Sequence, residues 1–171
     1  MKGSAPNHYE RAFEGWLRDH RVQYGLADER SRAQVAQHKI KSPDFLLYPK
    51  DGRTIIAEVK GRKFRGETFE RLKGFECWVT AEDVSGLAKW QDVLGRGHTA
   101  VFVFAYKIEN VDVDFDGREV FEFGPDKYVF FGIELDEYRR RMKQRSPKWR
   151  TVTLNAEKFR ECAVPLEELL L

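Results

Sequence analysis

Two stretches of the chain carry apolar side chains at the spacing of an amphipathic helix. In the first, residues 7–20, large apolar side chains recur every three or four positions, at Tyr9, Phe13, Trp16 and Leu17. This pattern predicts a helix with one buried face, and Asn7 with Glu10 has the spacing of a capping box at its start. The second stretch, residues 81–94, ends before a glycine and predicts another helix.

Shorter apolar runs predict strands. Residues 40–48 and 54–60 flank an Asp-Gly turn and predict one β-hairpin. Residues 100–108 are almost continuously apolar, which is typical of a strand covered on both faces. Because the predicted helix 81–94 lies between an extended stretch at 75–80 and this strand, we expect a crossover that joins parallel strands.

The rest of the chain alternates short elements with polar segments. Residues 118–123 and 128–133 predict a second hairpin, and residues 138–145 predict a basic helix. The basic, glycine-containing segment 62–74 predicts a mobile loop. The remaining segments stay open: 21–27 as a strand or connector, 28–38 as a helical turn or loop, and 150–154 and 165–171 without an assignment.

Three charged residues interrupt the first predicted hairpin. Side chains alternate across a strand, so Glu58 and Lys60 point to one face while Ala57 and Val59 point to the other. Asp44 lies in the partner strand. Two carboxylates beside an ammonium suit Mg²⁺, which binds one or two carboxylates, several waters and a substrate phosphate. Lys60 would position or deprotonate an attacking water and offset charge on the phosphate.

These charged residues carry a resemblance to a known family. Pro-Asp at 43–44, followed after the hairpin turn by Glu-Val-Lys at 58–60, resembles the signature of the PD-(D/E)XK nuclease superfamily. That group includes restriction endonucleases and Holliday-junction resolvases. The sequence HYERAFE at residues 8–14 also looks like the HYExAFE signature of a family of uncharacterised bacterial proteins within this superfamily.

The resemblance implies an α/β fold with a restriction-endonuclease-like α-β-β-β-α-β core. This core would span about residues 7–108, with its third strand near 75–80, and its mixed central sheet would be flanked by helices. Residues 109–171 would add a C-terminal β-hairpin and a basic helix. We therefore expect a single nuclease-like domain over residues 1–171.

The resemblance also implies a metal site. In resolvase-like members a glutamate of the first helix often joins the site, so Asp44, Glu58 and Glu10 would hold Mg²⁺ or Mn²⁺. Glu10 is equally well explained as a carboxylate that caps the helix N-terminus, and Glu14, one turn later, is the second choice. In several branches a polar residue of the crossover helix faces the site; the candidates, more simply explained as solvent-facing, are Lys89 and Gln91.

Charge is distributed unevenly although the net charge is only +2. Segments 60–74 and 136–150 carry net charges of +4 and +5, whereas segment 109–126 carries −6. Such asymmetry suits a protein with one face toward phosphates, although solvated surface charge explains either basic segment equally well. Trp149, between two basic residues, is a candidate for stacking on a base. The residues expected to contact nucleic acid are Arg62, Lys63, Arg65, Arg139, Arg140 and Lys143.

Composition limits the other function classes. The 171 residues are 42% hydrophobic and 34% charged, as expected of a folded chain. No run of about 18 apolar residues predicts a membrane span, and the N-terminal segment lacks the apolar core of a signal peptide. Cys77 and Cys162 have no metal-ligand spacing and are best interpreted as thiols in a reducing cytoplasm, although a disulfide stays open.

Together these features predict a cytoplasmic, Mg²⁺-dependent nuclease that hydrolyses phosphodiester bonds, with DNA a better candidate than RNA. No recognition helix is evident in the sequence, so we expect structure-selective rather than sequence-specific cutting. A homodimer stays open. The alternatives are a nuclease-like module that binds nucleic acid without cutting it, and an interaction domain in which Glu-Val-Lys is a solvated strand.

Overall fold

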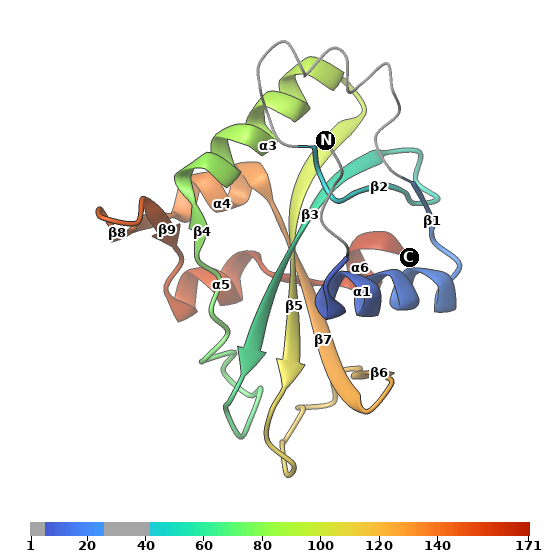
Figure 1. Cartoon of the computed structure of the whole chain (residues 1–171), viewed down its shortest axis with the longest axis vertical. Coiled ribbons are helices and arrows are strands. Elements are labelled where there is room, and N and C mark those ends of the chain that lie inside the picture. The colour runs from blue at the N-terminus through green and yellow to red at the C-terminus, as the bar shows by residue number, and fades with distance from the viewer. Residues whose placement is uncertain (1–5, 26–41) are drawn as a thin grey trace.

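The computed structural model describes residues 6–25 and 42–171 (Figure 1). The expectations for residues 26–41, including a helical turn or loop at 28–38 and the beginning of the strand 40–48, lie outside the described residues. In chain order the elements are α1 (His8–Asp19), β1 (Gln23–Gly25), β2 (Phe45–Tyr48), β3 (Thr54–Phe64), β4 (Val79–Thr80), α3 (Ala81–Leu94), β5 (His98–Ile108), β6 (Phe121–Phe123), β7 (Asp126–Glu134), α4 (Leu135–Arg141), β8 (Lys143–Ser146), β9 (Thr151–Thr153), α5 (Ala156–Cys162), β10 (Val164–Pro165) and α6 (Leu166–Leu170).

A mixed central sheet organises the described residues. Its strands lie in the order β1-β2-β3-β5-β7-β10, and β6 pairs with β7. β3 and β5 run parallel, whereas β2 pairs antiparallel with β3 and β7 pairs antiparallel with β5. β4, β9 and β8 form a separate three-stranded sheet. A crossover through α3 does join parallel strands, but these strands are β3 and β5; the predicted first strand, at 75–80, is not one of them.

Both faces of the central sheet are covered. Helices α1 and α6 lie on one face, and α3, α4 and α5 lie on the other (Figure 1). Alternation along β3 divides its residues between the two cores: Ile55, Ala57 and Val59 pack beneath α1, whereas Ile56 and Phe64 pack on the side of α3. The side chains of Glu58, Lys60 and Arg62 share that second side.

The two predicted long helices are confirmed, together with their starts. Asn7 caps α1: its side chain accepts a hydrogen bond from the Glu10 amide, and the Glu10 carboxylate accepts one from the Asn7 amide. Thr80 and Asp83 form the same arrangement at the start of α3. α3 ends at Gly95, whose φ of 75° is a conformation that glycine adopts without strain.

The α-β-β-β-α-β order is present, but its strands differ from those expected. The third strand is not the segment 75–80: only Val79–Thr80 is a strand, and it pairs with β9 outside the central sheet. The missing central strand is β1, one of the two alternatives for residues 21–27, and it pairs with β2. Three residues are too few to show an alternating pattern, which is why the sequence left this segment open.

Two element boundaries in the basic segments were also wrong. β3 continues to Phe64, so Arg62 and Lys63 belong to a strand and not to a mobile loop. The predicted helix 138–145 is α4, which spans Leu135–Arg141, and the next residues form β8. The second predicted hairpin is confirmed as β6 and β7, with Phe123 opposite Asp126.

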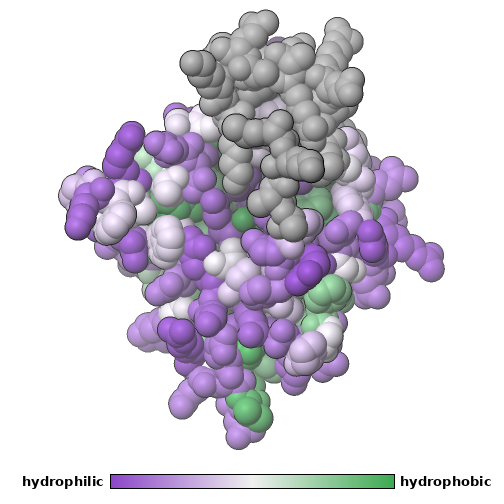
Figure 2. Space-filling view, viewed as in Figure 1, coloured by the Kyte–Doolittle hydropathy of each residue, from purple (hydrophilic) through white to green (hydrophobic). Residues whose placement is uncertain are grey.

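The outer surface is mainly hydrophilic on the face that Figure 2 shows, with only small apolar areas outside the uncertain segments. Within the described residues no helix is both long and apolar enough to cross a bilayer. The large aromatic residues instead fill the two cores, among them Phe102 and Phe104 of β5.

The contact between α1 and β3 generates a stability prediction. A Cβ added to Gly61 would lie 2.1 Å from Tyr9 Cδ2 and 2.3 Å from Tyr9 Cγ, and these ring atoms cannot swing away as the end of a flexible chain would. We expect Gly61→Ala to lower the free energy of unfolding by about 1–3 kcal/mol, measured by urea unfolding.

Two further variants test the cause of that loss. Tyr9→Ala in the Gly61→Ala background removes the clash, so the two substitutions should be less than additive. Gly25→Ala is the matched control, because its added Cβ meets nothing within 4 Å. Additive losses in the double variant would contradict the proposed contact.

Candidate active site

Asp44 and Glu58 meet where β2 begins beside β3. The antiparallel register pairs Leu46 with Ile56 and Phe45 with Ala57, so the next pair outward joins Asp44 to Glu58. The Asp44 carboxylate accepts a hydrogen bond from the Val59 amide at 2.8 Å. Leu46 and Ile56 lie in the same core, which places both carboxylates on the side of the sheet that α3 covers. The structure therefore brings together the two acids that the sequence singled out.

Lys60 lies between two carboxylates on that side of β3. Its Nζ is 3.7 Å from Glu58 Oε1 and 2.9 Å from Asp83 Oδ2. The side chain of Lys60 is 17% exposed and that of Glu58 is 8% exposed, so the group is largely shielded from solvent. Asp83 belongs to the first turn of α3, where the Thr80 cap fixes its position. The helix thus anchors the lysine.

The donor set fits a hard divalent cation held by few protein ligands. Across residues 6–25 and 42–171, no three His, Cys, Asp or Glu side chains form a group that could hold a metal ion. A three-carboxylate cage is not required, because Mg²⁺ typically binds one or two carboxylates and completes its shell with waters and phosphate oxygens. Asp44 and Glu58 supply that number.

Glu10 and Glu14 lie on α1, which packs against the other face of the sheet. Glu10 forms the capping box with Asn7, as one of the two alternatives predicted. Glu14 is bound by Arg18 at 2.9 Å and by the Tyr24 hydroxyl at 2.6 Å. Glu10 does not complete a three-carboxylate group with Asp44 and Glu58 in this structure.

Arg62, the next residue on the same side of β3, is held by Trp78. Its guanidinium lies 4.0 Å from the centroid of the indole ring and donates to the Trp78 carbonyl and, at 2.7 Å, to the Gly61 carbonyl. Burial lowers the pKa of the Arg62 guanidinium from its ordinary value, against smaller opposing effects of Tyr106 and Glu76. This arginine is therefore a half-buried part of the framework and not the free loop residue that the sequence predicted.

A cleft of about 490 Å³ begins one residue after Lys60. Glycines at 61, 66 and 74 form part of its wall. Its other lining residues are two aromatic, three basic and one acidic: Tyr9, Trp78, Arg62, Lys63, Arg65 and Glu76. The excess of basic residues next to Glu58 and Lys60 makes the cleft suitable for a phosphate-bearing ligand.

The remaining predicted nucleic-acid contacts lie in two places. Lys63 and Arg65 are exposed at the cleft. Arg139 and Arg140 are exposed on α4, where Arg140 pairs with Glu137, and Lys143 is exposed at the start of β8. Arg140 is thus partly neutralised within the protein.

The two polar candidates on the crossover helix α3, Gln91 and Lys89, differ in their surroundings. Gln91 does not point to Lys60; its Oε1 accepts a hydrogen bond from the Ala100 amide at 2.7 Å and so fixes the beginning of β5. Lys89 is half-buried. The polar residue of α3 that does reach the site is Asp83.

Sequence reasoning missed Asp83 and Trp78. A signal for Asp83 was available, since Thr-Ala-Glu-Asp at residues 80–83 has capping-box spacing, and such a start fixes an acidic side chain at the N-terminus of a helix. Trp78 had no comparable signal. Its role depends on Arg62 from β3, sixteen residues earlier.

Comparison of this structure with solved structures supports the fold. A solved structure of the Holliday junction resolvase Hjc from Archaeoglobus fulgidus, an archaeal hyperthermophile, matches with a TM-score of 0.52 and 11% identity, over 95% of this chain and 92% of that chain. The expected resolvase-like, restriction-endonuclease-like fold is therefore confirmed. The sequence matches no protein-family model, and no curated protein is significantly similar to it. The resemblance of residues 8–14 to the HYExAFE family stays a prediction.

The ion pair between Lys60 and Asp83 predicts a pH dependence of stability. Burial raises the pKa of the Asp83 carboxyl, but the Lys60 ammonium and hydrogen bonds from Lys60 and Thr80 together lower it by more, so the net pKa lies below the ordinary value of 3.8. A carboxyl whose pKa is lowered on folding stabilises the protein above its ordinary pKa and loses that contribution as pH falls through the lowered pKa.

We therefore expect wild type to be more stable than Asp83→Asn near neutral pH, and this difference should shrink as the pH falls below about 4. Asparagine keeps the acceptor for the Thr80 amide, so the comparison isolates the charge. Urea unfolding at a series of pH values measures this difference in the free energy of unfolding. Asp92→Asn is the control on the same helix, as Asp92 is exposed and forms no ion pair with any described residue. A pH-independent difference for Asp83→Asn would contradict the assignment.

Proposed function

We propose that this protein is a metal-dependent nuclease that hydrolyses phosphodiester bonds of DNA. The observation that carries the proposal is the meeting of Asp44 and Glu58 across β2 and β3, with Lys60 held on the same side of the sheet. The resolvase-like fold supports it, because a Holliday junction is a DNA structure. The cationic cleft beside the site supplies a place for the substrate backbone.

Asp44 and Glu58 would hold Mg²⁺ or Mn²⁺, and Glu10 stays a prediction as a further ligand. When bound, such an ion lowers the pKa of a bound water and stabilises charge on the scissile phosphate. The protein's own contribution is to fix the two carboxylates: the Val59 amide holds Asp44, and burial limits the freedom of Glu58.

Lys60 would supply a fixed positive charge and orient the attacking water. Asp83 holds the ammonium from the side of α3, so the lysine is preorganised before substrate arrives. Asp83 is therefore a positioning residue in this proposal. Its loss should leave Lys60 in place but less ordered.

The proposed substrate is branched or otherwise structured DNA. The basic residues at the cleft would bind phosphates, which carry no sequence information directly. The fold neighbour is a Holliday junction resolvase. We therefore infer structure-selective cutting. Whether the protein is a homodimer is a separate question, which size-exclusion chromatography answers.

A cleavage panel tests the proposal. Duplex, single-stranded, flap and four-way-junction DNA are incubated with Mg²⁺, Mn²⁺ or EDTA, using wild type, Asp44→Asn, Glu58→Gln and Lys60→Ala. We expect cutting to require a divalent ion and to fall about a hundredfold or more in each variant, because each removes either a proposed metal ligand or the charge that orients the water. Binding without cutting under every condition would instead favour a nuclease-like binding module.

Glu10→Gln and Glu14→Gln form a matched pair for that panel. They remove one carboxylate each from the same helix, and Glu14 is already bound by Arg18 and Tyr24. If Glu10 is a metal ligand, only Glu10→Gln reduces cutting, and a higher concentration of Mn²⁺ should partly restore it. Circular dichroism verifies that both variants are folded.

The basic cleft predicts salt-dependent binding. Six phosphate contacts would lower affinity about a thousandfold between 50 and 200 mM salt. Lys63→Ala and Arg65→Ala should each reduce the slope of log affinity against log salt by about one, measured by fluorescence anisotropy in EDTA. Arg18→Ala is the control, because Arg18 is not one of the described residues that line the cleft and it pairs with Glu14. An equal change in all three variants would contradict a localised site.

A further inference from the structure

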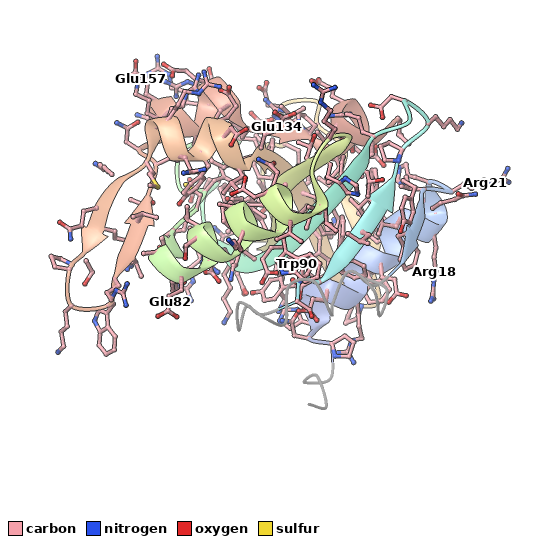
Figure 3. All side chains as sticks on the ribbon, turned by 90° about the horizontal axis from the view of Figure 1, so that it is seen from above. Arg18, Arg21, Glu82, Trp90, Glu134 and Glu157 are labelled. Atoms are coloured by element: carbon pink, nitrogen blue, oxygen red, sulfur yellow. The ribbon has the colours of Figure 1, made fainter. Side chains whose placement is uncertain are left out.

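A short hairpin projects from the body of the molecule beside the candidate site. β8 and β9 pair antiparallel, and the turn between them spans residues 147–150. Figures 1 and 3 both show this hairpin extending away from the central sheet. It is not part of either core over most of its length, since β8 is exposed at Lys143, Gln144 and Arg145.

The tip of the hairpin carries an exposed indole among basic side chains. Trp149 is 69% exposed, whereas Trp16 and Trp90 are 1% exposed. The hairpin segment 143–153 contains four basic residues and no acidic residue. Lys148 lies 5.2 Å from the Trp149 ring centroid, and neither Lys143 nor Lys148 forms an ion pair with any described residue. An exposed aromatic ring beside cations such as Lys148, which no described acid neutralises, matches the requirements of unpaired nucleic acid, which offers base faces and phosphates together.

The base of the hairpin is rigid. The buried Tyr138 hydroxyl donates to the Cys77 carbonyl at 2.7 Å and approaches the Val152 carbonyl at 3.2 Å. At the other strand, the irregularity between Gln144 and Ser146 turns the Arg145 guanidinium over the Trp78 ring, 4.9 Å from its centroid. A fixed base and an exposed tip allow Trp149 to make contacts without a large ordering cost.

The hairpin is linked to Lys60, the proposed catalytic lysine, through β4 and the start of α3. Thr151, two residues after Trp149, pairs with Thr80 of β4. Thr80 caps α3 by accepting a hydrogen bond from the Asp83 amide at 3.0 Å, and Asp83 holds Lys60. Glu82, labelled in Figure 3 at the start of α3, lies 3.5 Å from Arg150. A strand bound at Lys60 that continues toward α3 would therefore meet the hairpin.

We propose that Trp149 stacks on an unpaired base of the DNA next to the cleavage point, while the basic residues of the hairpin hold the flanking phosphates. The inference rests on the proposed function for its link to cutting. It assigns the preference for structured DNA to this element: a flap or single strand presents an unstacked base to the indole, whereas a continuous duplex does not.

The charge of the hairpin decides among partner classes. The four basic residues of segment 143–153, with no acidic residue among them, match the phosphates of nucleic acid, whereas a protein partner would have to present an acidic surface to complement them. An anionic membrane shares that charge complementarity, but a single exposed ring gives it little apolar area to bury. Both partner classes are retained as outcomes of the test.

The test compares Trp149→Ala, Trp149→Phe and wild type in EDTA, with fluorescein-labelled oligo-dT, a flap and a duplex of equal length. We expect Trp149→Ala to lose about tenfold in affinity for oligo-dT and the flap and less than twofold for the duplex, because one base-stacking contact is removed. The salt slope should stay unchanged, since no charge is removed. Trp149→Phe should restore most of the affinity, and oligo-dT should quench tryptophan emission in wild type but much less in Trp149→Phe.

Val111→Ala is the matched control, because Val111 is a 92% exposed apolar residue on another loop; it should bind every DNA as wild type does. Unchanged affinity of Trp149→Ala for oligo-dT and the flap would overturn the inference. So would a change confined to oligomeric state in analytical ultracentrifugation, or to binding of phosphatidylserine vesicles.

Cleavage separates this inference from the proposed function. If wild type cuts nothing but Trp149-dependent quenching by oligo-dT is observed, nuclease activity fails and the stacking site stands. If wild type cuts and Trp149→Ala cuts flap and duplex in the wild-type ratio, the activity stands and the stacking site fails.

Discussion

The parallel pairing of β3 with β5 is the constraint on which the rest of the structure depends. The two strands match residue for residue from Thr54 opposite His98 to Phe64 opposite Ile108, and helices cover both faces of the pair. Where these helices cover the strands, a charged side chain cannot simply turn to water, so it must be compensated inside the protein. This requirement selects the partners of Glu58, Lys60 and Arg62.

Glu58 pairs with Lys60 on β3 itself, whereas the partners of Lys60 and Arg62 on the other side come from residues 78–83, which include β4 and the start of α3. Asp83 binds Lys60, and Trp78 covers Arg62. The same segment pairs with β9, so the polar side of β3 is the place where the central and the three-stranded sheets are joined. One short segment therefore has three roles. It neutralises the buried charge of β3, it fixes the start of α3, and it attaches the second sheet. The cleft lies at the end of this junction, where compensation by the protein is incomplete and basic side chains reach the surface.

The sequence was sufficient to predict those elements whose signal lies in a short stretch of neighbouring residues. Capping residues located α1 and α3, and the near-continuous apolar run located β5. It was also sufficient to place Asp44 beside Glu58, because an Asp-Gly turn between two strands sets which residues face each other. It failed where long-range pairing decides: β1 has only three residues, and β4 pairs with a strand about seventy positions later. Arg62 was assigned to a loop because its basic neighbours concealed the strand that an aromatic partner stabilises. These interactions leave no periodic signal in the chain.

The arrangement of the two sheets has a consequence for how such a protein can diversify. The β8–β9 hairpin contributes no strand to the central sheet, and its turn contacts neither core. Changes in the length or residues of that turn therefore leave the β3–β5 pairing and its buried charges undisturbed, provided that Arg150, Thr151 and Val152 keep their contacts at the base. The outer element can vary by insertion or replacement while the inner framework is inherited unchanged. The residues of the turn that select a ligand can therefore change at a different rate from the residues of β3 that are proposed to carry out the reaction.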